Sequence, residues 1–253
     1  MEQVSLSELL KSPYIAVISY PSVSLREARK RTKQMERMGV EAIVFEGKTK
    51  IGRLGVLGIG TVSIVVKAIC AKREFALKLR RTDSNRESMK NEFEITSFVN
   101  RLGIGPRVYA FTNELLLMEL IKGLTLEEVL LSIRGKGRKE KTRELIHSIL
   151  NQCRKLDIVG VDHGELSNLR KHILIAEDRV VLLDFESASF GRKPKNVTSA
   201  AQYLLIGSSI SERIRKILGI VDTERIKKTL RQYKERHDDY SYSKLLEEIG
   251  VSV

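Results

Sequence analysis

Cysteine is scarce in this sequence and tryptophan is absent. The two cysteines, Cys70 and Cys153, stand far apart and form neither a CxxC motif nor a cysteine–histidine spacing typical of zinc ligands. The sequence therefore argues against a disulfide framework and a structural zinc site, and it fits a reducing cytoplasm. Few cysteines together with abundant lysine, arginine and glutamate are also common among proteins of thermophiles.

Long apolar runs are absent as well. No stretch of the 253 residues is apolar over the length that crosses a bilayer, and residues 1–14 lack the basic-then-apolar pattern of a secretory signal. We therefore expect no membrane contact. Hydrophobic residues make up 42% and charged residues 30% of the chain, which predicts a folded globular protein.

Positive charge is in excess. The 45 lysines and arginines outnumber the 32 aspartates and glutamates, and the net charge of +13 attracts polyanions such as nucleotides, RNA or an acidic partner. A basic loop is expected at residues 134–143, where it could contact RNA phosphates or an acidic protein. This run has no aromatic residues for base stacking, so a solvated loop is the simpler alternative.

The first 46 residues have a strand–helix–strand pattern. Residues 14–20 are rich in β-branched and aromatic side chains and end at a proline, which predicts a strand. A capping box at Ser24 and Glu27 begins a helix that ends near Gly39, and residues 42–45 predict a second strand. Such a unit is too small to fold alone, so we expect it to pack on the next part of the chain, as a cover or as a partner-docking surface.

The rest of the chain changes from strands to helices. Strands and glycine turns are predicted over residues 48–79, a helix over 85–102, and two more strands over 108–111 and 114–119. Beyond residue 123 the pattern is helical apart from a hairpin over 172–185. This order predicts an α+β protein with an extension at 1–46, a β-rich lobe at 47–121 and a helical lobe at 122–253.

A glycine-rich segment lies between two predicted strands. Gly58 and Gly60 begin a near match to GxGxxG in which Ser63 replaces the third glycine, and Val65 belongs to the adjoining β-branched run. A dinucleotide-binding fold would need a helix here and a Walker-type loop would need a Lys-Ser/Thr pair. A flap of strand, glycine loop and strand can cover phosphates with its N–H groups, and an ordinary hairpin turn is the equal alternative.

A lysine in the next strand has a predicted carboxylate partner. Ala76 and Lys78 lie in an alternating strand, where a surface lysine is the commoner interpretation. Glu92, however, falls on the apolar stripe of the next helix, one turn before Ile95. A carboxylate on a buried face is costly unless a cation pairs with it, so we predict an ion pair between Lys78 and Glu92.

Two acidic motifs lie in the helical half. Glu165 is part of the sequence Val-Asp-His-Gly-Glu-Leu, and Asp184 ends an apolar run in the sequence Asp-Phe-Glu. Phosphoryl transfer needs one carboxylate near the attacking hydroxyl and a second one on Mg²⁺, and Glu165 and Asp184 suit these two places. The alternative for Asp184 is a turn-capping aspartate after a strand.

In their order along the chain, these motifs resemble the protein-kinase superfamily, above all its small atypical branch of RIO kinases, the kinase of the KEOPS tRNA-modification complex and archaeal Ser/Thr kinases. The resemblance covers residues 51–206 and implies a bilobal kinase-like fold that uses ATP and Mg²⁺. It implies that His163 braces the catalytic loop and that catalysis rests on Lys78, Glu165 and Asp184. It implies a nucleotide site made of Gly58, Gly60, Ser63, Val65, Ala76, Lys78, Glu92, Met118, Glu119 and Ile121, with Glu119 and Ile121 giving backbone contacts to adenine.

The sequence departs from the kinase pattern at several points. Glu165 replaces an aspartate, and the extra methylene moves its carboxylate by about 1 Å. The metal-binding asparagine has no clean counterpart, because Asn168 comes early and His172 fills its place, so metal binding would rest mainly on Asp184. Glu186 replaces the glycine after Asp-Phe, and no Ala-Pro-Glu motif comes after it.

Three functions fit these observations. The first is Mg-ATP-dependent phosphoryl transfer to a serine or threonine of a protein, in trans or on the chain itself. The second, suggested by the altered loop at residues 165–172, is an ATP-binding pseudokinase or scaffold that docks on RNA or on a protein. The third, suggested by the missing peptide-docking segment, is a small-molecule kinase.

Overall fold

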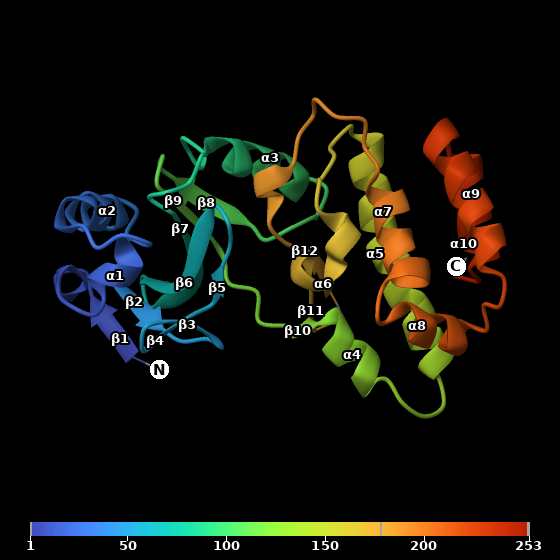
Figure 1. Ribbon diagram of the computed structural model, residues 1–253, viewed down its shortest axis with the longest axis horizontal. Helices are drawn as coiled ribbons and strands as arrows, with labels where there is room; N and C mark the ends of the chain where they lie inside the picture. The colour runs from blue at the N-terminus through green and yellow to red at the C-terminus, as the bar shows by residue number, and fades with distance from the viewer. Residues whose placement is uncertain (1, 178, 252–253) are drawn as a thin grey trace. The chain divides into compact units, whose positions relative to one another are not determined.

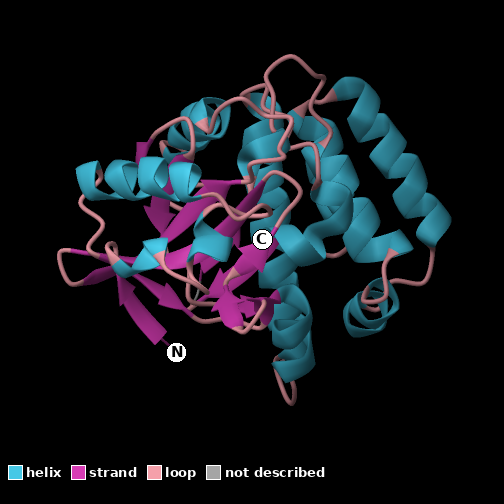
Figure 2. Cartoon of the chain, turned by 60° about the vertical axis from the view of Figure 1, so that its left-hand side comes forward, coloured by secondary structure: helices cyan, strands magenta, loops and turns pink. Residues whose placement is uncertain are grey.

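The structure, a computed structural model, describes residues 2–177 and 179–251. The chain forms two compact units, Met1–Arg101 with Pro106–Ile121 and Leu102–Gly105 with Lys122–Val253. Strands dominate the first unit and helices the second (Figure 1 and Figure 2), which confirms the predicted α+β class. No helix in the described residues combines the length and the hydropathy of a membrane span.

The N-terminal unit is built on a seven-stranded antiparallel sheet. Its strand order is β1 (Glu2–Ser5), β2 (Ala42–Phe45), β6 (Ser63–Cys70), β7 (Arg73–Arg80), β9 (Leu115–Glu119) and β8 (Val108–Phe111), with β5 (Gly58–Ile59) paired to β6. A separate hairpin joins β3 (Thr49–Ile51) to β4 (Leu54–Val56). Between β6 and β7 the chain turns through Ala71 and Lys72, both with positive φ, as tight two-residue hairpins require.

The helices of this unit are η1 (Glu8–Leu10), α1 (Ile15–Ile18), α2 (Leu25–Arg37) and α3 (Lys90–Asn100). The strand expected at residues 14–20 is wrong, because this segment contains α1 and the place beside β2 belongs to β1. The β preference of branched residues is weak, and packing overrides it here because α1 buries Val17 and Ile18 completely. The helix after Ser24 is confirmed, since the Ser24 side chain accepts a hydrogen bond from the Glu27 N–H.

The two faces of the sheet carry different side chains, because successive residues of a strand point to opposite sides. Leu77 and Leu79 of β7 point to one face, where they share a hydrophobic core with the extension. The extension contributes Val4, Leu9, Val17, Ile18, Ala28, Met35, Val40, Ile43 and Phe45 to this core. The first 46 residues therefore pack on the sheet as expected, while Lys78 alternates with these leucines on β7.

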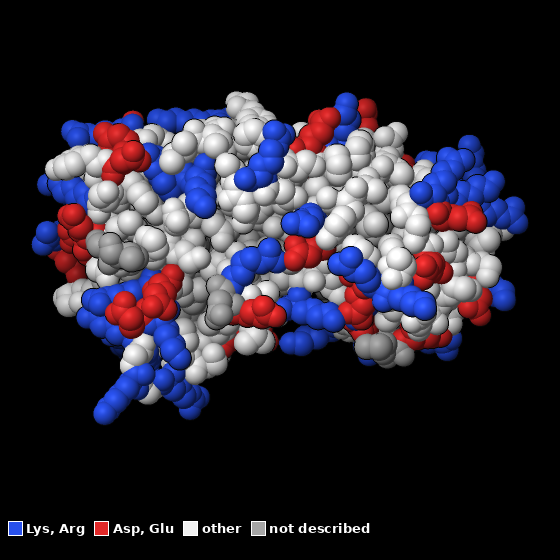
Figure 3. Space-filling view, turned by 180° about the vertical axis from the view of Figure 1, so that it is seen from behind, with Lys and Arg blue, Asp and Glu red and all other residues white. Residues whose placement is uncertain are grey.

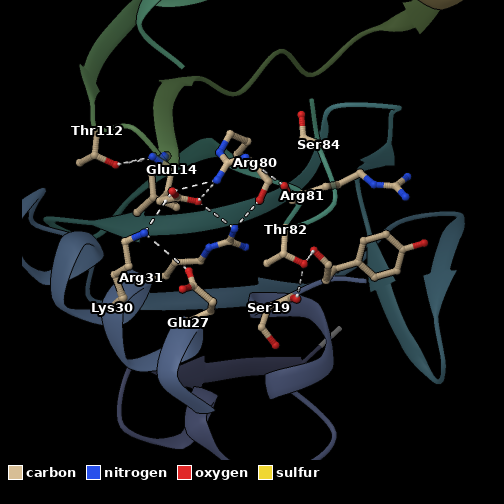
Figure 4. Close-up of polar contacts among 12 residues, drawn as sticks. Ser19, Glu27, Lys30, Arg31, Arg80, Arg81, Thr82, Ser84, Thr112 and Glu114 are labelled. Carbon is tan, nitrogen blue, oxygen red and sulfur yellow. Dashed lines mark hydrogen bonds and ion pairs between the residues drawn. The ribbon is translucent and has the colours of Figure 1, made fainter. Parts of the chain in front are cut away.

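A buried charge network fastens α2 to the sheet (Figure 4). Arg31 of α2 has no exposed surface, and its guanidinium donates to the carbonyls of Ile18 at 2.7 Å and Arg80 at 2.5 Å and to Glu114 at 3.0 Å. Arg80 and Lys30 also donate to the Glu114 carboxylate, at 3.0 and 3.2 Å. Burial by itself would raise the pKa of Glu114, but these three cations outweigh it and lower that pKa below 4.5.

The C-terminal unit is helical apart from a three-stranded sheet of order β10 (Leu124–Thr125), β11 (Ile173–Ala176) and β12 (Arg179–Leu182). Its longer helices are α4 (Leu126–Ser132), α5 (Arg138–Ile158), α7 (Asn196–Gln202), α8 (Ser211–Leu218), α9 (Thr223–Arg236) and α10 (Asp239–Glu248). Its short helices are η2 (Leu166–Asn168), α6 (Leu169–His172), η3 (Phe185–Ser187) and the π-helical η4 (Tyr203–Gly207).

The basic loop expected at residues 134–143 is shorter than predicted, because α5 already begins at Arg138. Gly135 and Gly137 have positive φ and make the turn before the helix. Thr142 is buried on the same stripe of α5 as Leu145 and Ile149, which draws the second half of the basic run into the helix.

A buried carboxylate at the end of α5 organises the neighbouring loops. Asp157 accepts hydrogen bonds from the backbone N–H groups of Asn196 and Val197, from the Asn196 side chain and from the Tyr233 hydroxyl, at 2.8–3.2 Å. Asn196 in turn accepts from the N–H of His163 at 2.9 Å and donates to the carbonyl of Val161 at 2.7 Å. The loop that begins at Val161 is thereby tied to α5 and α7.

Replacing Glu114 with glutamine should lower the free energy of unfolding at pH 7 by about 3 kcal/mol, because the buried Arg31 loses its counter-charge. The folded-state pKa of Glu114 lies below its unfolded value, so its contribution is present above the unfolded pKa and is lost as the pH falls through the folded pKa. The difference between variant and wild type should therefore shrink as the solution is acidified below 4.5. Thermal denaturation followed by circular dichroism measures both effects.

Glu94→Gln is the matched control, because Glu94 is exposed and pairs with Lys90 at 3.6 Å. It should change the free energy of unfolding by less than about 0.5 kcal/mol. A Glu114→Gln variant as stable as the wild type, or a difference that does not vary with pH, would contradict this role of the network.

Candidate functional site

The predicted site residues divide between the two units. The N-terminal unit holds Gly58, Gly60, Ser63, Val65, Ala76, Lys78, Glu92, Met118, Glu119 and Ile121. The C-terminal unit holds Glu165, Asn168, His172 and Asp184.

The glycine segment forms a strand–turn–strand hairpin, as the sequence predicts. β5 pairs with β6 through Gly58 and Val65, and the Gly60 N–H donates to the carbonyl of Ser63 at 2.7 Å. Arg81 donates to the Gly60 carbonyl at 3.1 Å and holds the turn from one side. Ser63, which replaces the third glycine of the motif, has only 3% of its surface exposed. Gly58 thus lies in the strand and Gly60 at the start of the turn, while the larger Ser63 is buried.

The ion pair predicted between Lys78 and Glu92 is present. Lys78 Nζ of β7 lies 2.5 Å from Glu92 Oε1 of α3, and the two residues are 5% and 6% exposed. Lys78 is the cross-strand partner of Val65, the residue that also pairs with Gly58 of the glycine hairpin. Because residues directly opposite each other point to the same face of a sheet, Lys78 and Val65 share one face. This geometry holds the Lys78 ammonium group beside the Glu92 carboxylate and away from solvent.

The predicted adenine contacts lie at the end of β9 and just after it. Met118 of β9 is the cross-strand partner of Ala76. The N–H of Glu119 donates to the carbonyl of Arg107 at 2.7 Å, and its carboxylate accepts the N–H of Arg107 at 3.0 Å. Since the Glu119 N–H already has a partner, a backbone contact of this residue with a base would come from its carbonyl oxygen. Ile121 is partly exposed at the end of the unit.

Three of the four residues in the C-terminal unit come together. One ligand atom each from Glu165, His172 and Asp184 lies within 4.8 Å of the others. Glu165 Oε2 is 3.0 Å from His172 Nε2. Two carboxylates suit Mg²⁺, whose remaining positions water can fill, while an imidazole nitrogen suits softer divalent ions better. Asn168 lies exposed at the end of η2, and its role as a metal ligand stays a prediction.

Asp184 occupies a sharp turn. Its φ of +68° is in the left-handed region, which non-glycine residues adopt at a cost of about 1–3 kcal/mol. His163 lies beneath this turn with no exposed surface, donates from Nε2 to the carbonyl of Leu183 at 3.0 Å and packs on the ring of Phe185. Burial lowers the pKa of His163 to about 4, so it is neutral and acts as the brace that the sequence suggested.

Sequence reasoning missed Ser187 and Arg192. The Ser187 hydroxyl donates to Glu165 Oε1 at 2.5 Å, so each oxygen of Glu165 has a partner. Arg192 donates to Asp162 at 2.7 Å and to the carbonyl of Ser187 at 2.5 Å. A Cβ added at Gly164, whose φ is positive, would lie 2.9 Å from that carbonyl, which requires glycine here. The sequence offered one indication that Ser187 belongs to the site, because this residue lies only three positions after Asp184.

The chain matches a known protein family. The family model described as RIO domain matches residues 65–197, which is more than half of the chain and includes Lys78, Glu92, Glu165 and Asp184. An uncharacterized protein of Methanocaldococcus jannaschii is 32% identical over 120 residues, which are 47% of this chain and 99% of that protein.

Two solved structures of APH(2″)-IIa align with this chain at low similarity. Its ternary complex with streptomycin and ATP is 15% identical with a TM-score of 0.40, and its gentamicin complex is 16% identical with a TM-score of 0.41. Each alignment covers 89% of this chain and 96% of the other. On the evidence of the matched domain, the chain belongs to the RIO-domain family, whose members are ATP-dependent phosphotransferases of kinase-like fold.

Proposed function

We propose that this protein is an atypical serine/threonine protein kinase that uses Mg-ATP. The observation that carries the proposal is the buried ion pair between Lys78, on the strand next to the glycine hairpin, and Glu92 of α3. A lysine held by a carboxylate in this way can neutralise the α- and β-phosphates of a nucleotide without swinging away into solvent. The glycine hairpin adds backbone N–H groups that can cover the phosphates.

The C-terminal unit supplies the groups that act on the metal and the acceptor. Asp184 would be the main ligand for Mg²⁺, with His172 beside it. Glu165 orients the acceptor hydroxyl and receives its proton as the oxygen attacks the γ-phosphate. Its longer side chain is not left loose, because His172 and Ser187 each hold one of its oxygens. These two contacts offset the extra methylene that distinguishes Glu165 from an aspartate.

The proposed acceptor is a hydroxyl on a protein, either another chain or this one. The residue types at the site suit phosphoryl transfer, but none of them recognises a particular peptide. An RNA or RNA–protein partner is a further proposal, suggested by the net charge of +13.

A second candidate is a nucleotide-binding protein without turnover. It is favoured by one observation, the engagement of both oxygens of Glu165 by His172 and Ser187. If those contacts persist with ATP bound, the carboxylate orients no acceptor. This candidate predicts ATP binding without transfer of the γ-phosphate.

Lys78→Met and Asp184→Asn should each reduce phosphate transfer from γ-labelled ATP by at least about a thousandfold, because each removes a charge that positions or neutralises the phosphates and their metal. The readout is label incorporated into the protein itself and into a generic protein substrate in the presence of Mg²⁺. Lys67→Met is the matched control, since Lys67 is also a buried, ion-paired lysine of the same sheet. Transfer that survives either site variant, or is lost equally in the control, would refute these roles.

Glu165→Gln should lower kcat by about a hundredfold or more while leaving the Kd for ATP within about twofold, because the amide keeps the shape but cannot take up the proton. Steady-state kinetics and equilibrium ATP binding separate the two constants. Glu144→Gln, an exposed carboxylate on α5, is the control and should change neither. If wild type binds ATP but shows no transfer that depends on Glu165, the candidate without turnover is correct instead.

A further inference from the structure

The outward face of α2 carries positive charge that the proposed phosphoryl transfer does not use. Successive residues of an α-helix are rotated by about 100°, so that residues three, four, seven and eleven positions apart share a face. The residues that α2 buries form one stripe: Ala28, Arg31, Thr32 and Met35. The exposed cations outside this stripe form the α2 basic face: Arg26, Arg29, Lys30, Lys33 and Arg37.

Most of this charge is not neutralised within the protein. Lys30 reaches Glu27 at 3.7 Å and Glu114 at 3.2 Å. Among the described residues, no carboxylate forms an ion pair with the other four members of the α2 basic face. Glu36 is also exposed on α2, so it offsets one of the five positive charges without pairing with any of them. Figure 3 shows a dense group of Lys and Arg side chains at the edge of the N-terminal unit where Figure 1 places α2.

The helix that carries these residues is held rigidly. Arg31 fastens its inner side through hydrogen bonds to Arg80 and Glu114 (Figure 4) and to the carbonyl of Ile18. Gln34 adds a contact, since its side chain accepts from the Thr112 hydroxyl at 2.6 Å. Over the eleven residue steps from the first to the last cation of the face, the helix rises by about 16 Å. The cations are therefore presented as a fixed row and not as a mobile tail.

The residue types of the α2 basic face indicate the class of partner that it binds. Protein interfaces combine arginine with apolar or aromatic anchors, and the α2 basic face has arginines but no apolar or aromatic residue. A helix that lies in a membrane surface needs an apolar side to insert, whereas the apolar side of α2 is buried in the protein core. The exposed Val23 and Leu25 lie at the N-terminal end of the helix, outside the row. Several cations along one helix face, with no apolar residue among them, match the charged phosphates of a nucleic acid.

We propose that the α2 basic face binds the phosphate backbone of duplex RNA. The α2 basic face consists of Arg and Lys only, side chains that commonly contact the phosphates of a nucleic acid. A helix packed on a sheet offers a shallow surface, which suits the wide, shallow minor groove of A-form RNA and its flanking phosphates. The binding is therefore independent of sequence and falls with rising salt, and it is separate from phosphoryl transfer.

The test is fluorescence anisotropy with a labelled RNA duplex of about 20 base pairs, measured over a series of KCl concentrations. The variant Arg26→Gln/Lys33→Gln/Arg37→Gln removes three members of the row and leaves Lys30 and its contact with Glu114 in place. Loss of three phosphate contacts should reduce the slope of log K against log[KCl] by about 2 to 3 and weaken binding at least about tenfold at roughly 0.1 M KCl.

The control is Lys228→Gln/Arg231→Gln/Lys234→Gln on α9, which removes the same charge from exposed positions of the other unit. It should leave the slope and the Kd close to those of wild type, and circular dichroism should show all three proteins folded. If both variants bound RNA equally weakly, the loss of affinity would be due to net charge alone, and this result would overturn the proposal. Wild-type binding by the α2 variant would overturn it too, as would equal binding of a DNA duplex, or binding of anionic vesicles or an acidic protein in place of RNA.

Discussion

The two-sided character of β7 is the constraint on which the N-terminal unit depends. Leu77 and Leu79 need an apolar cover, whereas the buried Lys78 between them needs a carboxylate as its partner. The extension provides the cover, and α3 provides the carboxylate through Glu92. Because the strand cannot rotate without exposing both leucines, the hydrophobic core itself sets the direction of the lysine. The first 46 residues thus serve the candidate site without contributing a residue to it.

In the helical unit the main constraint is the placement of the Glu165 carboxylate, whose side chain is one methylene longer than the aspartate of the kinase pattern. A carboxylate oxygen has two lone pairs, so the contacts of Glu165 with His172 and Ser187 use only part of its capacity. The same contacts restrict the rotamers of the side chain and reduce the entropy lost when an acceptor binds. Whether the residue assists transfer or only closes the loop then depends on how readily the Ser187 hydroxyl gives way to an acceptor hydroxyl, which is a competition between two similar donors.

Much of the fold and part of the site could be predicted from the sequence, and the failures have physical causes. The stripe of α3 predicted the partner of Lys78 because a buried charge has few options. The strand predicted at residues 14–20 was wrong because strand preference is weak and packing determined the observed structure. Ser187 was missed because its contact with Glu165 spans 22 positions and depends on how two loops close on each other. The start of α5 was missed because glycines and charges hide the stripe that begins at Thr142.

The helix α2 shows how burial decides what a positive charge does. Arg31 is buried, and an unpaired guanidinium there would carry a large desolvation cost. Its hydrogen bonds to Ile18, Arg80 and Glu114 stabilise the fold. The members of the α2 basic face lie outside, where water satisfies them and no carboxylate needs to pair with them. Sequence periodicity alone would place Arg31 on the apolar stripe with Ala28 and Met35, an apparent conflict that the carboxylate of Glu114 resolves. Because the inner arginine fixes the helix, the outer cations gain the one property that isolated surface charges lack, a defined spacing on a rigid support.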